Sequence, residues 1–349
     1  MTQTGSTLSM QTAEQAQPAR QQGEAALIAL DWGTTSLRAY LFDAKGAVLD
    51  THASTAGIMN LPRPAAEGGF DAAFEAVAGS WLDAAPELPV IAAGMVGSAQ
   101  GWKEAPYVNA PASADALVEG IVRLQTARGV ALNIVPGVLQ NGELPNVMRG
   151  EETQIFGALA CSDASAAAKG VLIGLPGTHA KWVMVRDAKI ERFHTFMTGE
   201  VFAALSEHTI LGRTMVTPDR PDTDAFLRGV KVARDKGQAG VLATIFSSRT
   251  LGLTGQLTRE QQPDYLSGLL IGHELNGLEA ALAQQQSTLA GCALQLIGNE
   301  ALCERYRLAL AQFGCQQADL VRQATERGLW RIATQAGLVS EASGAAQAT

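Results

Sequence analysis

The sequence predicts an α/β fold of two domains in which mixed sheets are flanked by helices. Short apolar runs alternate along the chain with stretches of helical periodicity, and these runs lack the polar alternation of a sheet wetted on one face. In addition, residues 27–45 and 171–189 read as two copies of one unit, one in each half of the chain. We therefore expect sheets covered by helices on both sides, with one copy of the unit in each domain.

Each copy consists of an apolar run, a Gly-Thr break and a second apolar-rich run. Without gaps, Gly33 aligns with Gly177 and Thr34 with Thr178, and both copies end in Asp-Ala-Lys. This pattern predicts a β-hairpin, because glycine supplies the backbone freedom that a tight turn needs. Such a turn directs N–H groups and hydroxyls into one concavity, which suits an anion. We expect the two turns to face each other across a cleft and hold the phosphates of one nucleotide. The alternative, two ordinary hairpins of an α/β protein, is less favoured because of the shared identities.

Apolar spacing and turn residues place the other elements. In the first half, the expected strands are residues 47–49, 89–96 and 131–135, and the expected helices are residues 67–82, 114–128 and 150–159. A glycine-rich loop covers residues 94–102. In the second half, residues 197–200 read as a strand end and helix start, and the helix runs to about residue 211. A polar connector at residues 218–224, helices at residues 263–286 and 300–313, and a strand at residues 294–297 are also expected.

An Ala-rich stretch near residue 165 marks the expected domain boundary. The predicted domains are residues 25–165 and 166–337, with disordered tails at residues 1–24 and 338–349. A length of 349 residues suits two domains, and 47% hydrophobic residues are enough to build their cores.

Charge and cysteine content exclude several classes of protein. A net charge of −8 argues against a general nucleic-acid or anionic-membrane binder, and no apolar run is as long as a membrane span. The N-terminal residues lack the order of a secretion signal. The four cysteines show no CxxC pairing, so we expect free thiols of a reducing cytoplasm and no metal site built on Cys and His. The sequence leaves the oligomeric state open, with a homodimer as one possibility.

Three common signatures of nucleotide or hydrolase sites are missing from the sequence. There is no GxxxxGK[ST] of a P-loop, no GxGxxG after a strand as in dinucleotide-binding units, and no GxSxG elbow of a serine hydrolase. The nucleotide site must therefore be built from the hairpin pair and from the strand that ends at Gly298.

Together, the two hairpins, the strand before Gly298 and a helix that starts with two glutamates resemble the actin, sugar kinase and Hsp70 superfamily. This resemblance implies the two-domain actin-like ATPase (ribonuclease H-like) fold, with the ligand cleft between the domains. It implies a first phosphate motif at residues 31–36, a second at residues 177–179 and an adenosine motif at residues 294–298. Many members have a glycine where this chain has Asn299.

Roles for individual residues follow from the same resemblance. Asp31 would hold Mg²⁺, usually through water, as suits a hard cation that dehydrates reluctantly. The residues expected to bind ATP are Gly33, Thr34, Thr35, Gly177, Thr178, His179, Gly298 and Asn299. His179 has a plainer alternative as a structural histidine.

Within the superfamily, the sequence is most similar to the 2-oxo-3-deoxygalactonate kinases (2-dehydro-3-deoxygalactonokinases). The segments that carry the similarity are DWGTTSLRAYLFD, AGMVGSAQGWKEAPYVNAPA, MRGEETQIFGAL, LPGTHAKWVMV, MTGEVFAALSEHTILGR, LSGLLIGHEL and LIGNEALCERY, spread over residues 27–330. AGMVGSAQGW and MRGEETQIFGAL are the most specific of them. The similarity implies ATP-dependent phosphorylation of the C6 hydroxyl of 2-dehydro-3-deoxy-D-galactonate, a step of galactonate breakdown.

Glu151 and Glu152 are the candidates for the catalytic base. A carboxylate near the acceptor hydroxyl takes its proton as the new bond forms, and the dipole of a helix start keeps such a carboxylate ionised. The similarity to the Gly-Glu-Glu helix start of exopolyphosphatases in the same superfamily also implies that one Glu acts as base. The alternative is that both residues are ordinary acidic caps of a first helical turn.

The sugar acid needs a donor for its carboxylate, and Arg149 beside the glutamates is the best placed, because its planar fork suits bidentate capture. Lys181 could reach either a phosphate or the substrate. Both cations have the alternative of a solvated surface charge. Ser98 and Trp102 on the glycine-rich loop are candidate walls for the sugar chain, and Trp102 has the alternative of a core position.

Three other functions compete with this interpretation. A kinase for 2-dehydro-3-deoxygluconate would use the same motifs. A phosphatase of the exopolyphosphatase type shares both hairpins, but its second motif carries an acidic residue where this chain has Leu175-Pro176. A sugar sensor fused to a DNA-binding domain would need a helix-turn-helix before the first hairpin, and residues 1–24 are too short and polar for one. In a kinase, the two domains are expected to close on ATP and sugar acid and exclude water.

Overall fold

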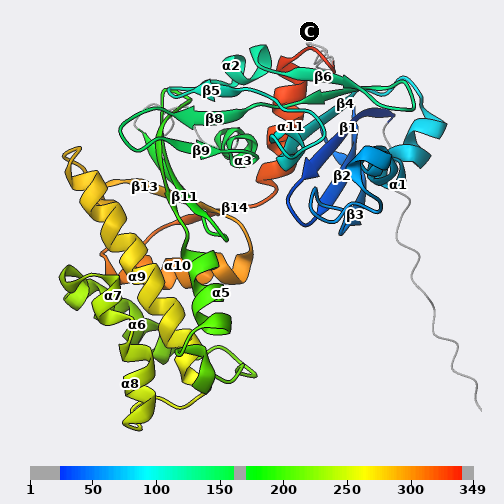
Figure 1. The fold of residues 1–349 in the computed structure, drawn as a ribbon. Helices are drawn as coiled ribbons and strands as arrows, with labels where there is room; N and C mark the ends of the chain where they lie inside the picture. The colour runs from blue at the N-terminus through cyan, green and yellow to red at the C-terminus, as the bar shows by residue number, and fades with distance from the viewer. Residues whose placement is uncertain (1–23, 161–169, 340–349) are drawn as a thin grey trace, which may run out of the picture.

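The computed structural model describes residues 24–160 and 170–339, arranged in two lobes that are each built on one main sheet (Figure 1). The first sheet has the order β3-β2-β1-β4-β7-β6 and the second the order β12-β11-β10-β13-β14. The strands of the first sheet are β1 (Ala25–Trp32), β2 (Leu37–Asp43), β3 (Val48–Ser54), β4 (Val90–Gly94), β6 (Val122–Gln125) and β7 (Ala131–Ile134). Those of the second are β10 (Val171–Leu175), β11 (Ala180–Arg186), β12 (Lys189–Phe196), β13 (Ala293–Ile297) and β14 (Asp319–Val321). A small third sheet, β5-β8-β9, contains β5 (Tyr107–Asn109), β8 (Gly137–Gln140) and β9 (Asn146–Met148).

The two main sheets repeat one topology, which confirms the predicted duplication and the actin-like α/β fold. In each, three consecutive strands are antiparallel, and the first of them also pairs in parallel with a later strand, β4 in one sheet and β13 in the other. The two turns differ in length. Trp32 lies opposite Leu37, which leaves residues 33–36 in the first turn. Leu175 lies opposite Lys181, so the second turn spans residues 176–180 and is one residue longer.

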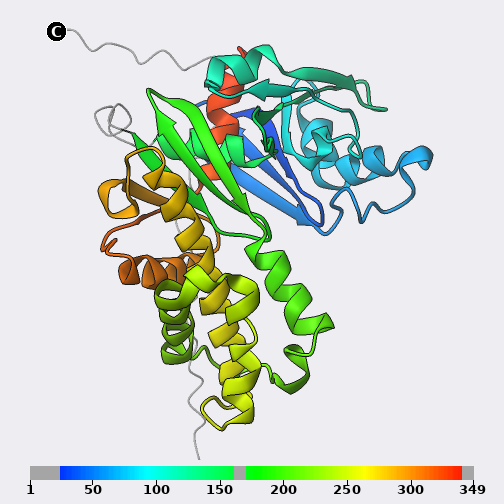
Figure 2. The same ribbon diagram turned by 60° about the vertical axis from the view of Figure 1, so that its left-hand side comes forward.

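Helices cover both faces of each sheet, as predicted. The outer face of the first sheet packs on α1 (Gly69–Ala84), which buries Phe70, Phe74, Val77 and Trp81 at spacings of three and four. The outer face of the second sheet packs on α6 (Thr223–Lys236), α9 (Gln261–Ala283) and α10 (Glu300–Gln312). The helices α7 (Val241–Thr244) and α8 (Ser247–Leu253) lie beside them, toward the end of the molecule farthest from the first sheet, and α5 (Thr198–His208) runs from the second sheet toward that end (Figures 1 and 2).

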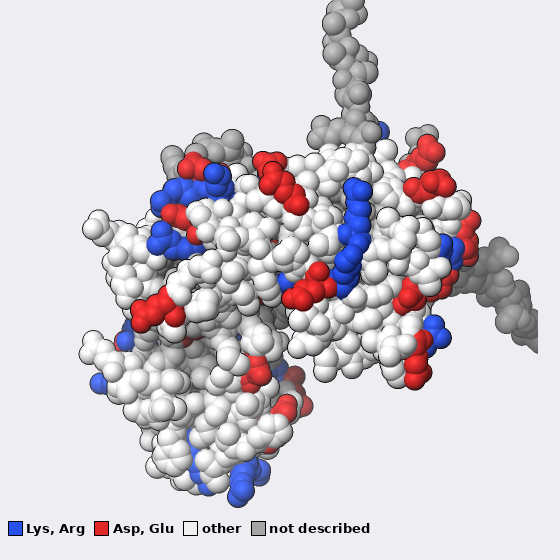
Figure 3. Space-filling model, turned by 45° about the horizontal axis from the view of Figure 1, so that its top comes forward, with Lys and Arg blue, Asp and Glu red and all other residues white. Residues whose placement is uncertain are grey.

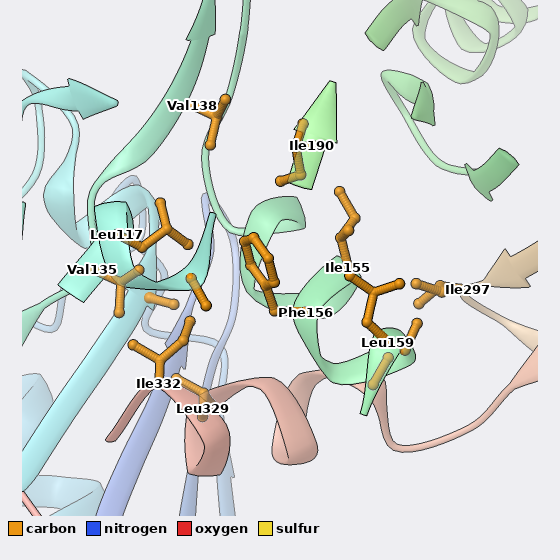
Figure 4. Close-up of a cluster of buried hydrophobic side chains, with 14 of the residues drawn as sticks. Leu117, Val135, Val138, Ile155, Phe156, Leu159, Ile190, Ile297, Leu329 and Ile332 are labelled. Carbon is orange, nitrogen blue, oxygen red and sulfur yellow. The ribbon is translucent and has the colours of Figure 1, made fainter. Parts of the chain in front are cut away.

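Two helices lie between the sheets and join the lobes. They are α3 (Glu151–Leu159), which ends the first half, and α11 (Ala324–Gln335), which returns to pack on the first sheet near α2 (Ala114–Glu119). Figure 4 shows their apolar side chains in one cluster with Ile190 and Ile297 of the second sheet. The helices cross at two glycines: a Cβ on Gly157 would lie 1.8 Å from the carbonyl oxygen of Ala324, and one on Gly328 would lie 1.9 Å from that of Thr153. The backbones therefore touch, and neither glycine has room for a side chain.

One predicted helix is wrong over half its length. The helix expected at residues 114–128 ends at Glu119, and β6 follows as an antiparallel partner of β7. Gly120 ends the helix, and the alternation of half-buried Val122 and Leu124 with exposed neighbours suits a strand at the sheet edge. Pairing with β7 outweighs the helical spacing. The strand expected at residues 47–49 is also longer, because β3 extends to Ser54 along β2.

Some sequence predictions fall outside the described residues: the tail up to residue 23, the boundary stretch near residue 165, Cys161 and the tail from residue 340. Leu338 and Val339, placed in the second tail, pack on the core between the sheets. Cys292, Cys303 and Cys315 are free thiols, and burial raises the pKa of Cys303 to about 11. No helix in the described ranges is long and apolar enough to cross a bilayer. On the face shown in Figure 3, acidic and basic side chains are interspersed over both lobes.

Candidate active site

The first Gly-Thr turn is fixed by hydrogen bonds within the turn and by contacts with residues 57–59. The Gly33 N–H donates to the carbonyl of Ser36 across the turn, and the N–H of Met59 donates to the carbonyl of Thr34 at 3.0 Å. Gly57 permits this approach, since a Cβ there would lie 2.4 Å from the Thr34 carbonyl. Thr34 and Thr35 remain exposed. The turn is therefore fixed in shape while its threonines stay available to a ligand.

Asp31 lies near the end of β1, directly before this turn, and opposite Arg38 on β2. Burial raises the pKa of Asp31 above its ordinary value, and the charges of Glu326 and Glu151 add to this effect, while Arg38 acts against it. Carboxylates from β1, α3 and α11 thus lie within electrostatic range of one another. A bound cation would relieve their repulsion.

Backbone contacts bring the start of α3 to the end of β1. Gly150, the residue before the helix, has φ +106°, and a Cβ there would lie 3.3 Å from the Cα of Gly94. Gly94 itself has φ +96°, and its Cβ would lie 2.8 Å from the carbonyl oxygen of Trp32. The end of β1, the end of β4 and the start of α3 therefore meet without intervening side chains. This packing places Glu151 and Glu152 beside the first turn.

Glu151 connects the two lobes through an ion pair. Its Oε1 lies 3.1 Å from Nζ of Lys181, which stands just beyond the second Gly-Thr turn. The same ammonium donates to the backbone carbonyl of His179 at 3.2 Å. The backbone N–H of Arg149 donates to the other oxygen of Glu151, Oε2, at 3.0 Å. Lys181 is almost fully buried, whereas the Glu151 side chain keeps 26% of its surface exposed. The predicted sites of the two halves are therefore in direct contact.

Glu152, in contrast, is completely buried. Its Oε2 accepts from the Gly150 N–H at 2.7 Å and its Oε1 from the Thr153 hydroxyl at 3.1 Å. Burial, followed by the charge of Glu151, raises the pKa of Glu152 to about 7. Both of its oxygens are occupied by the helix start itself.

Arg149 is packed under the loop that leads from the glycine-rich segment. Its Nη2 donates to the Ala105 carbonyl at 2.8 Å, and its guanidinium lies 4.3 Å above the Tyr107 ring. Its Nε and Nη1 have no hydrogen-bond partner among the described residues, and neither does the buried hydroxyl of Ser98. A Cβ on Gly97, the residue before Ser98, would lie 3.0 Å from Nη1, so the Arg149 guanidinium lies against the glycine-rich loop. Buried donors without partners are costly and mark a place where a polar ligand or water is expected.

Trp102 joins an aromatic cluster of the first lobe. Its ring stacks on Phe70, with centroids 5.7 Å apart and an interplanar angle of 11°, and meets Trp32 edge-on at 5.8 Å. It is only partly buried. The structure thus gives Trp102 a packing role, and a contact with the sugar chain stays a prediction.

The second Gly-Thr turn lies against the start of α5. A Cβ on Gly199 would lie 2.5 Å from the carbonyl oxygen of Gly177, and the Glu200 N–H donates to the carbonyl of Thr178 at 3.1 Å. The imidazole of His179 pairs with the carboxylate of Glu200. The N-terminal end of a helix therefore borders the turn, which favours an anion there.

The predicted adenosine motif also reaches the second turn. Gly298 has φ +149°, and a Cβ there would lie 3.3 Å from the carbonyl oxygen of Pro176. The Asn299 side chain accepts from the Leu302 N–H at 3.2 Å and so caps α10. This capping bond gives Asn299 a structural role at the start of α10.

A cavity of about 530 Å³ lies between α5, α9 and α10. Its walls are both apolar and polar, and they include Phe202, Ser206, Met215, Asp264, Ser267 and Arg305. Both α5, which begins at the second turn, and α10, which begins after Gly298, line it. Within the described ranges, His, Cys, Asp and Glu side chains form no group of three or more that could hold a metal ion.

Sequence reasoning missed several residues of this site. Gly57 and Gly199 are each a glycine in a segment without strong periodicity, and only the three-dimensional contact shows why glycine is needed. Glu326 lies close enough to affect the pKa of Asp31 but is almost 300 positions away in the sequence, so no local sequence pattern predicts that the two residues are neighbours.

Comparison with known proteins agrees with this arrangement. The sequence profile of the 2-keto-3-deoxy-galactonokinase family matches residues 31–332. The 2-dehydro-3-deoxygalactonokinase of Escherichia coli (strain K12) is 37% identical over 290 residues, which cover 82% of this chain and 90% of the relative. A crystal structure from Sinorhizobium meliloti, assigned to a 2-dehydro-3-deoxygalactonokinase protein, superimposes with a TM-score of 0.77 at 34% identity, covering 88% of this chain and 98% of that one. The chain therefore belongs to the 2-keto-3-deoxy-galactonokinase family.

Proposed function

We propose that this protein transfers the γ-phosphoryl group of ATP to the C6 hydroxyl of 2-dehydro-3-deoxy-D-galactonate, giving the 6-phosphate and ADP. The observation that carries the proposal is the contact of Lys181, beside the second turn, with Glu151, which lies in range of Asp31 beside the first turn. These contacts support a site in which both phosphate turns and a carboxylate base for the acceptor hydroxyl come together. Family membership supports the choice of sugar acid over the gluconate-derived epimer and over an exopolyphosphatase-like reaction.

Glu151 is the base in this proposal. A base must reach the proton it removes, so geometry ranks before pKa. Glu152 has no exposed surface and uses both oxygens within its own helix turn, whereas Glu151 is partly exposed. Glu152 then serves to fix the backbone at Gly150, which holds Glu151 in place.

In the reaction, the C6 oxygen of the sugar acid attacks the γ-phosphorus in line. A bond forms between these two atoms, the bond from the γ-phosphorus to the β–γ bridging oxygen breaks, and ADP leaves with that electron pair. The proton of the C6 hydroxyl passes to the Glu151 carboxylate. Lys181 and the N–H groups and hydroxyls of the Gly-Thr turns neutralise charge on the phosphates. His179 is a further candidate donor at the second turn.

Mg²⁺ fits the surroundings of Asp31. The carboxylate lies among like charges, and Mg²⁺ is commonly held by only one or two carboxylates, with water and phosphate oxygens completing its shell. Asp31 would hold the ion, which when bound supplies positive charge to the β- and γ-phosphates. This agrees with the lack of a larger ligand cluster in the described part of the chain.

Arg149 and Ser98 are proposed to bind the carboxylate and 2-oxo group of the sugar acid. Both are buried, both have unpartnered polar atoms and both lie beside the loop at Gly97. For adenosine, we propose the cavity between α5, α9 and α10, because α5 and α10, the helices that begin at the two nucleotide motifs, contribute to its walls. ATP as cosubstrate and the free thiols suit a reducing cytoplasm.

A coupled assay tests the proposal. ADP formation is expected to require ATP, Mg²⁺ and 2-dehydro-3-deoxy-D-galactonate together, with slower turnover of the gluconate epimer. Release of inorganic phosphate without a sugar acid would instead indicate a phosphatase.

Two isosteric variants test the base. We expect Glu151→Gln to lower kcat by about 10²–10⁴-fold while ATP still binds, because general base catalysis contributes on that scale. Glu152→Gln is the matched control and should retain most of the turnover. If Glu151→Gln turns over at a normal rate, Glu151 is not the base.

A further inference from the structure

Glu274 is a buried carboxylate that no step of the proposed reaction uses. It lies on α9, in the segment LSGLLIGHEL, and is 3% exposed. Three neutral donors surround it. The Trp182 indole N–H donates to Oε1 at 2.7 Å, the Tyr306 hydroxyl donates to Oε2 at 2.8 Å, and the Thr198 hydroxyl also donates to Oε2.

Each donor belongs to an element that carries part of the proposed nucleotide site. Trp182 follows Lys181 on β11. Thr198 is the first residue of α5, directly before the glycine that contacts the second phosphate turn. Tyr306 lies on α10, the helix that begins immediately after Gly298 and Asn299. One carboxylate therefore ties together the strand, the helix start and the adenosine-side helix.

The chemistry of the group suits such a tie. An ionised carboxylate only accepts hydrogen bonds, and here each donor finds an acceptor. Burial raises the pKa of Glu274, while the three donors act in the opposite direction by favouring the charged form. An apolar side chain of similar size would fill the space but leave the buried indole N–H of Trp182 without this acceptor.

We propose that Glu274 is a positioning residue, whose carboxylate holds β11, α5 and α10 in the relative geometry that binds the phosphates and adenosine of ATP. This inference rests on the proposed function, because it assumes that ATP binds to these elements. It assigns Glu274 no contact with substrate.

Direct ATP titration of the wild type, Glu274→Leu and Glu274→Gln tests the inference, with KM for the sugar acid measured alongside. We expect the leucine variant to weaken ATP binding by about tenfold or more, which corresponds to about 1.4 kcal/mol. KM for the sugar acid should change little. The glutamine variant should retain affinity, since its amide oxygen accepts from Trp182 and its NH₂ group donates to hydroxyls that rotate to accept.

Leu278→Ala is the control, because it removes a fully buried side chain one turn further along the same helix. Equal loss of ATP affinity in Leu278→Ala and Glu274→Leu would overturn the inference, as would unchanged affinity in Glu274→Leu. If the leucine variant does not fold, Thr198→Val removes only the bond at the start of α5, and it should still weaken ATP binding measurably; unchanged affinity there would also overturn the inference. A wild-type chain that binds no ATP would contradict the proposed function itself and, with it, this inference.

Discussion

At the scale of single residues, Glu152 shows how burial changes the chemistry of a carboxyl group. Its pKa is about 7 in the folded protein, against an ordinary value of 4.5, because burial disfavours the charged form. The folded state therefore binds the proton more tightly than the unfolded state. Stability from this group is fully present below pH 4.5 and is lost as the pH rises through about 7.

We predict that Glu152→Gln gains stability relative to the wild type as the pH rises. The pKa difference corresponds to about 3 kcal/mol at most, since one pKa unit is worth about 1.4 kcal/mol. Urea unfolding of both proteins at pH 5 and pH 8 measures the change. A stability difference that is the same at both pH values would show that Glu152 does not titrate in this range.

Arg149 gives a second prediction at this scale. Arg149→Met removes the proposed fork for the substrate carboxylate, so KM for the sugar acid should rise by about 10- to 100-fold, as expected for loss of a charge-assisted bidentate pair. KM for ATP should stay within about threefold. Steady-state kinetics with each substrate varied in turn provide the test. Arg123→Met, which removes an exposed arginine bonded to Asn133 away from the site, is the control. A rise in both KM values would assign Arg149 to folding rather than to substrate binding.

At the scale of elements, the contact between α5 and the second turn depends on Gly199. The nearest atoms to an added Cβ belong to the backbone of Gly177 and Thr178, at 2.5 and 2.8 Å, and so cannot rotate away. Gly199→Ala should therefore displace the turn and raise KM for ATP by about tenfold. Gly142→Ala, where a Cβ would meet nothing within 4 Å, is the matched control. Normal ATP kinetics in Gly199→Ala would show that this packing does not shape the nucleotide site.

Sequence patterns predicted most elements that have a strong period or a repeated motif. The two hairpins follow from apolar runs on either side of a repeated Gly-Thr break, and α1 and α9 follow from apolar spacing. The edge strand β6 was predicted as helix, because its pairing with β7 is a tertiary contact that local spacing does not contain. The helix α6 lies in a stretch where no helix was predicted, although Phe226, Val230 and Ala233 repeat at helical intervals behind the Asp222 cap.

For the candidate site too, local sequence patterns predicted some features, and contacts between distant segments determine the others. Residues within motifs, such as Glu151 and Lys181, could be named from the sequence, but their pairing across the lobes could not. The roles of Gly57, Glu274 and Glu326 come from contacts between segments far apart in the chain, and no spacing within one segment reveals such contacts.

At the scale of the whole molecule, the proposed site is divided between the two lobes. We predict that they close when ATP and sugar acid bind together, since enclosure keeps water from the transferred phosphoryl group. Small-angle scattering should show a smaller radius of gyration with the sugar acid plus a non-transferable ATP analogue than with no ligand. The sugar acid alone is the control. An unchanged radius with both ligands would argue for a site that is already closed.

The crossing of α3 and α11 determines how such a motion is possible. Because the helices touch through Gly157 and Gly328, their axes are held closer than side chains would allow, at the seam between the lobes. If α3 slid along α11, the touching backbones would clash, whereas a small rotation of one helix relative to the other about the contact point would avoid the clash. Glu151 at the start of α3 is near this contact and would move little during such a rotation. The ends of α8 and α9 that lie farthest from the contact would move most. In such a closure, the two glycines would be the point about which the lobes turn.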